Sequence, residues 1–281
     1  MANRVIRVAF SVVIACALFV ATAVAKGRNV STSIDGKGPE SCSDIRVRFD
    51  EREGVRAEEQ IPIPAPGAEG LQIRLPEHTG LSVYGVDSGS YSVTACKAAL
   101  RSETLDRIAV SYAGGRVSVS EPQADDDWTV HLIVRAPRDA RLDLEASNGP
   151  IGVRDIRGAV HARNHNGPLS FRRCSGTIDA ETENGPISLS ETTGAVSARA
   201  VNGPISLSGD AGRARLDAKN GPISIRLNGD RWDGVRQVWA SGSPNSRHAV
   251  DTTDTFDLRA DSSQAINCAS TQPPRDPACW F

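Results

Sequence analysis

The sequence predicts an all-β protein whose central part is a β-solenoid with two strands in each 18-residue coil. The first observation is that Asn-Gly-Pro occurs five times, each copy 18 residues after the last (166 − 148, for example). The second is a series of glycines that recurs every nine residues (158 − 149) from Gly149 to Gly221. A fixed period of this kind indicates a repeat array, in which each unit stacks on its neighbours.

Apolar side chains follow these glycines with a period of two. In nearly every unit the second and fourth residues after the glycine are apolar, as in Ile187 with Leu189 and in Val196 with Ala198. Alternate residues of a strand face the same side, so each nine-residue unit is predicted to be a short strand and a turn. The strand after Asn-Gly-Pro carries the larger side chains, which suits a narrow interior between two sheets. Three-sided left-handed β-helices also have 18-residue coils, but the nine-residue glycine spacing argues against that version.

The N-terminus is typical of an export signal. Arg4 and Arg7 precede an apolar run that ends at the sequence Ala23-Val24-Ala25, so residues 1–25 are predicted to be a signal peptide. The run is also just long enough to span a bilayer as a retained anchor. A lipoprotein with Cys16 at its start is a weaker alternative, because the apolar run continues past that residue. We expect an exported protein of the periplasm or cell surface.

Four further segments are expected. Residues 26–70 form a flexible or extended lead-in, because they begin polar and end in the sequence Ile61-Pro-Ile-Pro-Ala-Pro66. Residues 71–138 form an N-terminal β region that continues into the solenoid, with period-two runs and a hairpin at Ala113-Gly114-Gly115. Residues 139–228 are the repeat solenoid itself. Residues 229–281 form a C-terminal cap over the apolar edge of the last coil.

Five of the six cysteines lie after the predicted cleavage site, so at least one has no partner within the chain. An oxidising compartment favours disulfides, and two are predicted: Cys268 with Cys279, which close a short loop, and Cys42 with Cys96. No Cys-x-x-Cys or Cys/His ligand spacing occurs, and Asp125-Asp126-Asp127 is expected to be a solvated loop. We therefore expect neither a metal site nor a cofactor.

Stacking of equal coils predicts rows of equal side chains. The amides at one corner are expected to form a structural ladder: Asn148, Asn166, Asn184, Asn202 and Asn220. Outward positions of the small-residue strands alternate in sign, as a charge ladder would: Glu145, Arg163, Glu181, Arg199 and Asp217. A row of hydroxyls on the other strands is the candidate contact face: Ser170, Ser188, Ser206 and Ser224.

Several function classes are disfavoured. The 32 basic and 34 acidic side chains nearly balance, which argues against a nucleic-acid partner, and membrane contact is expected only through an uncleaved signal. No G-x-S-x-G, H-E-x-x-H, P-loop or dinucleotide motif occurs, so no enzyme is predicted. His161 and His165 suggest a metal, but no carboxylate or Cys accompanies them at ligand spacing, so no metal site is predicted there.

The strand–glycine units, of the type NGPISLSETTGAVSARAVNGPISLS, follow a strand that ends at Pro137 and an exported N-terminus. Together they resemble the bacterial DUF4097 family, which carries a provisional adhesin label. The likeness is specific from Asp139 to Leu227 and extends back to Leu71. It implies a β-solenoid domain of the cell envelope and brings no catalytic residues with it. The C-terminal segment, with its three tryptophans and two cysteines, departs from the family pattern.

The sequence therefore predicts a non-enzymatic, exported, adhesin-like scaffold of the bacterial cell envelope, whose flat faces contact a protein or a glycan. A polysaccharide-active β-helix enzyme is one alternative, and it would need unpaired carboxylates near one strand row. An envelope-stress sensor is the other, and it would show a dedicated protein partner.

Overall fold

The computed structural model describes residues 20–25, 28–34, 38–50, 52–64, 70–123, 126–227, 237–241, 247–249 and 267–268. Only the backbone is described for the first two of these ranges, for residue 210 and from residue 226 onward. In this part of the chain the all-β prediction is confirmed, since the helices are the short turns η1 (Cys42–Asp44) and α1 (Ser102–Leu105). No helix among the described residues is long and apolar enough to cross a membrane.

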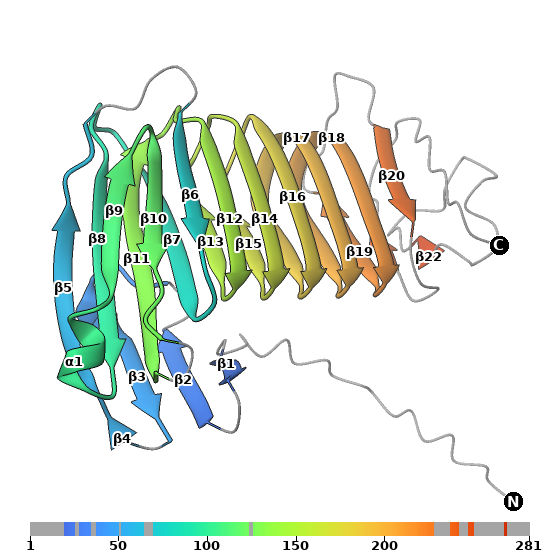
Figure 1. The fold of residues 1–281 in the computed structure, drawn as a ribbon. Coiled ribbons are helices and arrows are strands. Elements are labelled where there is room, and N and C mark those ends of the chain that lie inside the picture. Colours follow the sequence, from blue (N-terminus) through green and yellow to red (C-terminus); the bar gives the residue numbers. More distant parts are fainter. Residues whose placement is uncertain are drawn as a thin grey trace, which may run out of the picture.

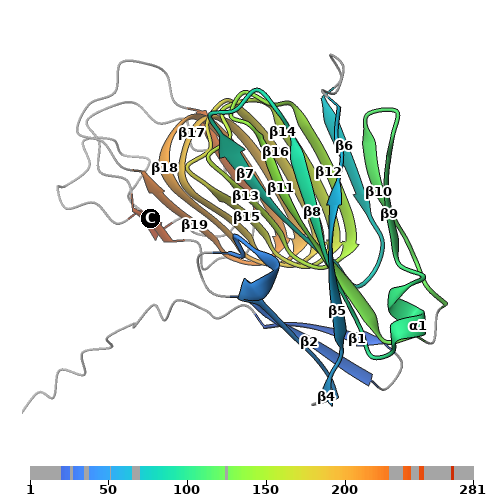
Figure 2. The ribbon, with the colours of Figure 1, turned by 90° about the vertical axis from the view of Figure 1, so that its left-hand side faces the viewer.

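Strands β5 to β22 form one large, nearly closed sheet. Figure 1 shows it as two rows of strands that run the length of the molecule, and in Figure 2, seen from the end formed by β5 and β9, the rows enclose a common interior. The first row contains β9 (Ala109–Ala113), β10 (Arg116–Ser120), β6 (Leu71–Leu75), β12 (Leu142–Asn148), β14 (Val160–Asn166), β16 (Thr177–Asn184), the second halves of β17 (Ile187–Asn202) and β18 (Ile205–Asn220), and β20 (Gln237–Ser241).

The second row faces the first. It contains β5 (Val55–Ile61), β8 (Ser92–Ala99), β11 (Trp128–Pro137), β7 (Thr79–Val86), β13 (Ile151–Arg154), β15 (Leu169–Arg172), the first halves of β17 and β18, β19 (Ile223–Leu227), β21 (Arg247–Ala249) and β22 (Asn267–Cys268). From β7 and β6 onward both rows are parallel. The predicted hairpin is present, because β9 and β10 pair antiparallel around Gly114 and Gly115, which both have positive φ.

Residues 18 apart are paired directly in both rows. Ile187, for example, lies between Leu169 and Ile205, and Val196 lies between Ile178 and Ala214. Between β12 and β19, the register shifts at the corner of β17 and β18, between Ser190 and Ala195. At the opposite corner the glycines permit close stacking, since a Cβ on Gly167 would collide with the carbonyl oxygen of Gly149.

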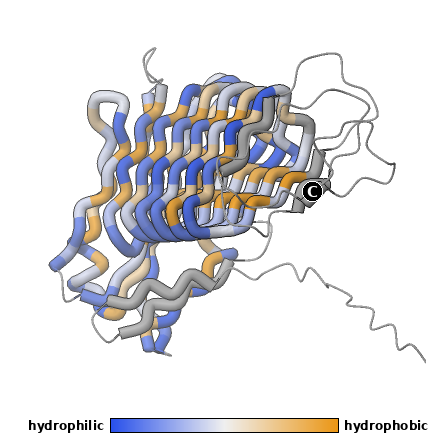
Figure 3. Tube along the Cα trace, turned by 90° about the vertical axis from the view of Figure 1, so that its right-hand side faces the viewer, coloured by the Kyte–Doolittle hydropathy of each residue, from blue (hydrophilic) through white to orange (hydrophobic). Residues whose placement is uncertain are grey.

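The interior is aliphatic and thin. Large side chains of the second row, such as Ile187 and Leu189, face small ones of the first row, such as Val196 and Ala198, and all four are buried. Figure 3 shows the resulting apolar stripes, which pass from coil to coil. Each buried Leu, Ile or Val contributes about 1.5–3 kcal/mol, so the core depends on many equal, small contributions.

The lead-in contains strands that pack on the outside of the second row. Strand β3 (Ile45–Phe49) belongs to an antiparallel sheet with β1 (Val20–Ala25), β2 (Arg28–Ile34) and β4 (Arg52–Glu53). Its buried Ile45, Val47 and Phe49 pack against the outer face of β8 and β11, where Ala98 and Ile133 lie. Residues 45–49, 52–53 and 55–61 of the lead-in are therefore extended strands held by packing and pairing. The outward face of β8 and β11 is apolar here, and packing against β3 removes it from water.

Two predicted segments lie largely outside the described residues. Of the signal peptide, residues 1–19 are outside, and of the cap 229–281 only the backbone of β20, β21 and β22 is described. Strand β20 pairs with β18 through residues 237–241, which extends the first row by one strand. The predicted pair Cys268 and Cys279 also falls outside the described side chains.

Candidate functional site

The five corner asparagines lie in one row and are hydrogen-bonded through their side chains. Each amide nitrogen Nδ2 donates to the Oδ1 atom of the asparagine one coil before. The distances, in order from Asn166 to Asn220, are 2.6, 2.8, 2.8 and 2.9 Å. The sequence predicted the row, and the structure adds its direction, with donors pointing toward the N-terminal end.

The outward charges of the first row are also stacked. Glu145, Arg163, Glu181, Arg199 and Asp217 occupy successive positions in register. Ion pairs join Arg163 Nε to Glu181 Oε2 at 3.3 Å and Arg199 Nε to Asp217 Oδ2 at 3.6 Å. These side chains are about half exposed, so each pair is worth only about 0.2–1 kcal/mol and serves register more than stability.

Arg74 of β6 extends this row by one strand. Its Nε lies 3.1 Å from Glu145 Oε2, and its Nη2 lies 2.7 Å from Asp143 Oδ2. The pKa of Asp143 is lowered: partial burial opposes ionisation, but the hydrogen bond and charge of Arg74 outweigh it. The sequence did not indicate Arg74, because it lies outside the 18-residue repeat.

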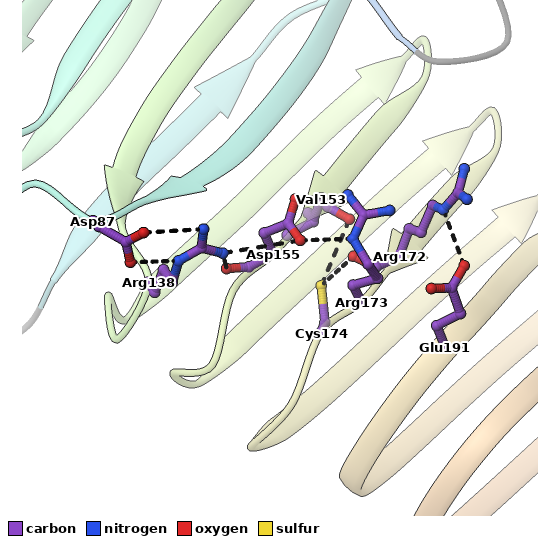
Figure 4. A network of polar contacts seen from close by, with 8 residues as sticks. All are labelled: Asp87, Arg138, Val153, Asp155, Arg172, Arg173, Cys174 and Glu191. Atoms are coloured by element: carbon purple, nitrogen blue, oxygen red, sulfur yellow. Dashed lines mark hydrogen bonds and ion pairs between the residues drawn. The ribbon is translucent and has the colours of Figure 1, made fainter.

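A second charge ladder follows the opposite corner (Figure 4). Arg173 donates from both Nε and Nη2 to the carboxylate of Asp155, each at 2.8 Å, and Arg138 Nε donates to Asp87 Oδ1 at 2.7 Å. The hydrogen bond from Arg173 is the main reason that the pKa of Asp155 lies below its ordinary value. The pKa of Asp87 is lowered in the same way by Arg138.

Three residues at this second corner have a left-handed backbone conformation. Asp155, Arg173 and Glu191 are 18 apart and have φ of 59°, 49° and 54°. A positive φ strains a residue that has a Cβ, so packing and ion pairing must hold it. The sequence carried a signal that was missed, namely an acid, a base and an acid at the repeat period.

The serine row lies where it was predicted. Ser170, Ser188, Ser206 and Ser224 are in register on β15, β17, β18 and β19, and Ser206 Oγ donates to Ser188 Oγ at 3.4 Å. The next row on the same face adds Ser190 and Ser208. Together these strands present a flat area of small hydroxyls.

Histidines on the opposite face pair with carboxylates of the next coil. His161 Nδ1 lies 3.0 Å from Asp179 Oδ2, and His165 Nδ1 lies 2.8 Å from Glu183 Oε2. Among the described residues, no group of three His, Cys, Asp or Glu side chains is placed to hold a metal ion. The histidines therefore form single cross-coil contacts.

One pairing of a hydroxyl with an imidazole was not foreseen. His131 Nε2 and Ser82 Oγ are 2.9 Å apart, and both side chains are buried on the outer face of β7 and β11. Burial lowers the pKa of His131 to about 4, so the ring is neutral. In the described part of the chain no carboxylate contacts its Nδ1, which instead lies against Gly80. A catalytic Ser–His pair needs access and an orienting partner, so this pair is a structural contact.

Asp126 also differs from its prediction as a solvated residue. Its carboxylate is buried and receives hydrogen bonds from Arg101 at 3.0 Å, Arg107 at 2.9 Å and Thr104 Oγ1 at 3.1 Å. It thereby ties α1 to the start of β11. A run of three Asp residues gave no sign that one of them turns inward.

The disulfide between Cys42 and Cys96 is confirmed. It joins η1 to β8 and so fastens the N-terminal sheet to the outer face of the second row. Cys174 is a buried free thiol whose pKa is raised, chiefly by burial. A buried thiol of this kind is inert toward nucleophilic chemistry.

No protein-family model and no curated protein sequence matches the chain. An adhesin from Parabacteroides merdae, provisionally so named, aligns over 76% of this chain and 96% of its own at 10% identity and a TM-score of 0.36. An adhesin from Bacteroides fragilis, named in the same way, covers 77% and 96% at 10% identity and a TM-score of 0.37. A protein from Parabacteroides distasonis, provisionally named for lipid binding, covers 76% and 96% at 10% identity and a TM-score of 0.35. Likenesses this distant carry no argument about function.

Proposed function

We propose that the chain is an exported β-solenoid with two strands per 18-residue coil, and that it serves as a non-enzymatic, adhesin-like scaffold of the cell envelope. The observation that carries this proposal is the register: equal side chains lie over one another every 18 residues in both rows. Such stacking produces long flat faces of repeated chemistry, which suit contact with an extended partner. The resemblance to the DUF4097 family belongs to the same proposal.

The state of the carboxylates supports a scaffold over an enzyme. A general acid needs a carboxyl whose pKa is raised toward neutrality by burial or by a like charge. Here Asp87, Asp143 and Asp155 lie beside arginines, and their pKa values are lowered instead. Carboxyl groups in this environment stay ionised and contribute to the folded structure, so a polysaccharide-active enzyme is the less favoured function.

Export is supported by the covalent chemistry. A disulfide such as Cys42–Cys96 persists in oxidising compartments and is rare in the cytosol. This fits the predicted signal peptide, residues 1–25, and a location in the periplasm or at the cell surface. Residues 229–281 act as the cap of the array in this proposal.

The contact face we propose is the hydroxyl face defined by Ser170, Ser188, Ser206 and Ser224. Its side chains are short and, apart from Ser188, exposed, so they can donate to and accept from a ligand at little cost in side-chain entropy. In its central part, around Ser188 and Ser206, the adjoining row adds further serines and no charge. A neutral glycan or an uncharged protein surface fits this chemistry better than an ionic ligand.

Two measurements test this proposal with the full exported chain. The first is binding to a glycan array, and the second is chemical cross-linking to intact cell envelopes. Ser188→Asp places a charge in the middle of the hydroxyl face, whereas Ser197→Asp places the same charge on the opposite face. We expect Ser188→Asp to abolish binding and Ser197→Asp to retain it. Equal binding by both variants would exclude this face. Release of soluble sugar fragments would favour the enzyme, and capture of one dedicated protein through another surface would favour the envelope-stress sensor.

A further inference from the structure

One column beside the serines of the hydroxyl face departs from the charge pattern of the array. Elsewhere, charged residues that lie opposite each other on neighbouring strands have opposite signs, as Arg163 and Glu181 do. Arg154 of β13 and Arg172 of β15 are paired in register, so two positive charges are neighbours. Among the strand pairs of the described residues, no other pair brings two like charges together. Like charges opposite each other destabilise a sheet, so the stability of the array does not explain this pair.

The two arginines share the outer face of the second row with the serines. Ser170 lies two residues before Arg172, on the same side of β15, and it is exposed. Its partner in register is Gly152, where an added Cβ would meet no atom closer than the carbonyl oxygen of Leu81, at 3.9 Å. The space over Gly152 is therefore open, and it lies one position along this face from the two arginines.

Two carboxylates border the arginines at the corner (Figure 4). Asp155 is engaged by Arg173, which donates to it from Nε and from Nη2, each at 2.8 Å. Glu191 Oε1 lies 3.3 Å from Arg172 Nε, but the side chain of Arg172 is 43% exposed and that of Glu191 is 52% exposed. An ion pair exposed to this degree is weak, so an external anion can displace Glu191 at little cost.

We propose that Arg154 and Arg172 form a binding site for an oxyanion, a carboxylate or a phosphate, that is carried by an otherwise uncharged glycan. A guanidinium group can donate two parallel hydrogen bonds to such an anion. Neighbouring strands are about 4.8 Å apart, so both guanidinium groups can contact a single anion, whose charge then offsets their mutual repulsion.

This inference rests on the proposed contact face and names the class of glycan that the face binds. The serines around Ser188 and Ser206 contact neutral sugar units, and the arginines, two coils nearer the N-terminal end, bind the acidic unit. Because the arginines lie toward one end of the serine row, the glycan has one preferred direction along the face.

The experiment measures binding of defined oligosaccharides to the full exported chain by titration calorimetry. One pair of ligands is a neutral oligosaccharide that ends in a single glucuronic acid and the methyl ester of the same compound. The other pair is a mannose oligosaccharide with one phosphate and the same compound without phosphate. We expect one acidic ligand to bind about tenfold more tightly than its uncharged counterpart, the factor that one charge-assisted hydrogen bond supplies. The pair of ligands that shows this difference identifies the oxyanion.

Two substitutions should change the preference for the acidic ligand in opposite directions. Arg172→Gln removes a charged donor and should abolish the tenfold preference. Glu191→Gln removes the carboxylate that competes for Arg172 and should increase the preference. Arg163→Gln is the matched control, because it removes one positive charge from the opposite face, and it should leave the preference unchanged.

Equal binding of each acidic ligand and its uncharged counterpart, or no binding of either, would overturn the inference. So would an unchanged preference in Arg172→Gln. Failure of the inference alone is distinguishable from failure of the proposed function. In the first case the neutral ligands still bind and Ser188→Asp still abolishes their binding, whereas in the second case Ser188→Asp has no effect on the neutral ligands.

Discussion

Replacement of Ile187 by aspartate tests the stacked architecture most directly. Ile187 is about 1% exposed and lies between Leu169 and Ile205, in the middle of the parallel second row. Loss of its side chain alone, as in Ile187→Ala, costs about 2–5 kcal/mol. Ile187→Asp adds an unpaired carboxylate to an aliphatic interior, which raises the cost further. The total is comparable to the whole stability of a typical domain, about 5–15 kcal/mol.

The assay is urea denaturation followed by far-ultraviolet circular dichroism. We expect Ile187→Asp to abolish the cooperative transition and Ile187→Ala to lower the midpoint. Ser188→Asp is the control, since it adds the same charge one residue away on the outward face, and its midpoint should stay near that of the wild type. A cooperative transition at the wild-type midpoint for Ile187→Asp would refute the reasoning, because residue 187 could not then be enclosed between two rows.

Three further predictions follow from other contacts. Asn184→Ala removes two ladder hydrogen bonds, whereas Asn148→Ala removes one. At ~0.5–1.5 kcal/mol per bond, calorimetry should show about twice the destabilisation for Asn184→Ala. Equal losses of stability in the two variants would contradict the ladder. Burial lowers the pKa of His131 to about 4 from an ordinary 6.5, so the folded state disfavours the protonated ring. The free energy of unfolding therefore holds its full value above pH 6.5 and falls by about 3 kcal/mol as the pH drops toward 4. A titration of stability should show this decline in the wild type and not in His131→Gln. Cys96→Ser removes the disulfide that spans 54 residues and should lower the free energy of unfolding by about 2–5 kcal/mol. Limited proteolysis of this variant should begin in the N-terminal sheet. Unchanged resistance to protease would argue against a role of the disulfide in holding that sheet to the second row.

Much of the array could be predicted because its information is periodic. A side chain in one coil meets the side chain 18 residues later, so Asn166 and Asn184, or Arg163 and Glu181, could be paired from spacing alone. The alternation of apolar and polar residues then assigned each side chain to the interior or to a face. The hydroxyl face and the first charge ladder were found in this way.

Contacts outside the repeat had no such signal. Arg74 meets Glu145, and Ser82 meets His131, across sequence separations that no period predicts. The sequence did contain the alternation of Ile45, Val47 and Phe49, but not the surface that those residues would cover. Packing of a non-repeated strand depends on which apolar face remains open, and that is known only once the two rows are in place.

The sequence by itself therefore determined the period, the inward and outward sides of each strand, and the disulfide Cys42–Cys96 as one of its possible pairings. The tertiary structure decided how the N-terminal sheet covers β8 and β11 and where the second charge ladder turns the corner. The physical reason is that a repeat specifies contacts between equivalent positions, whereas the ends of the array and the segments outside it are defined by their surroundings.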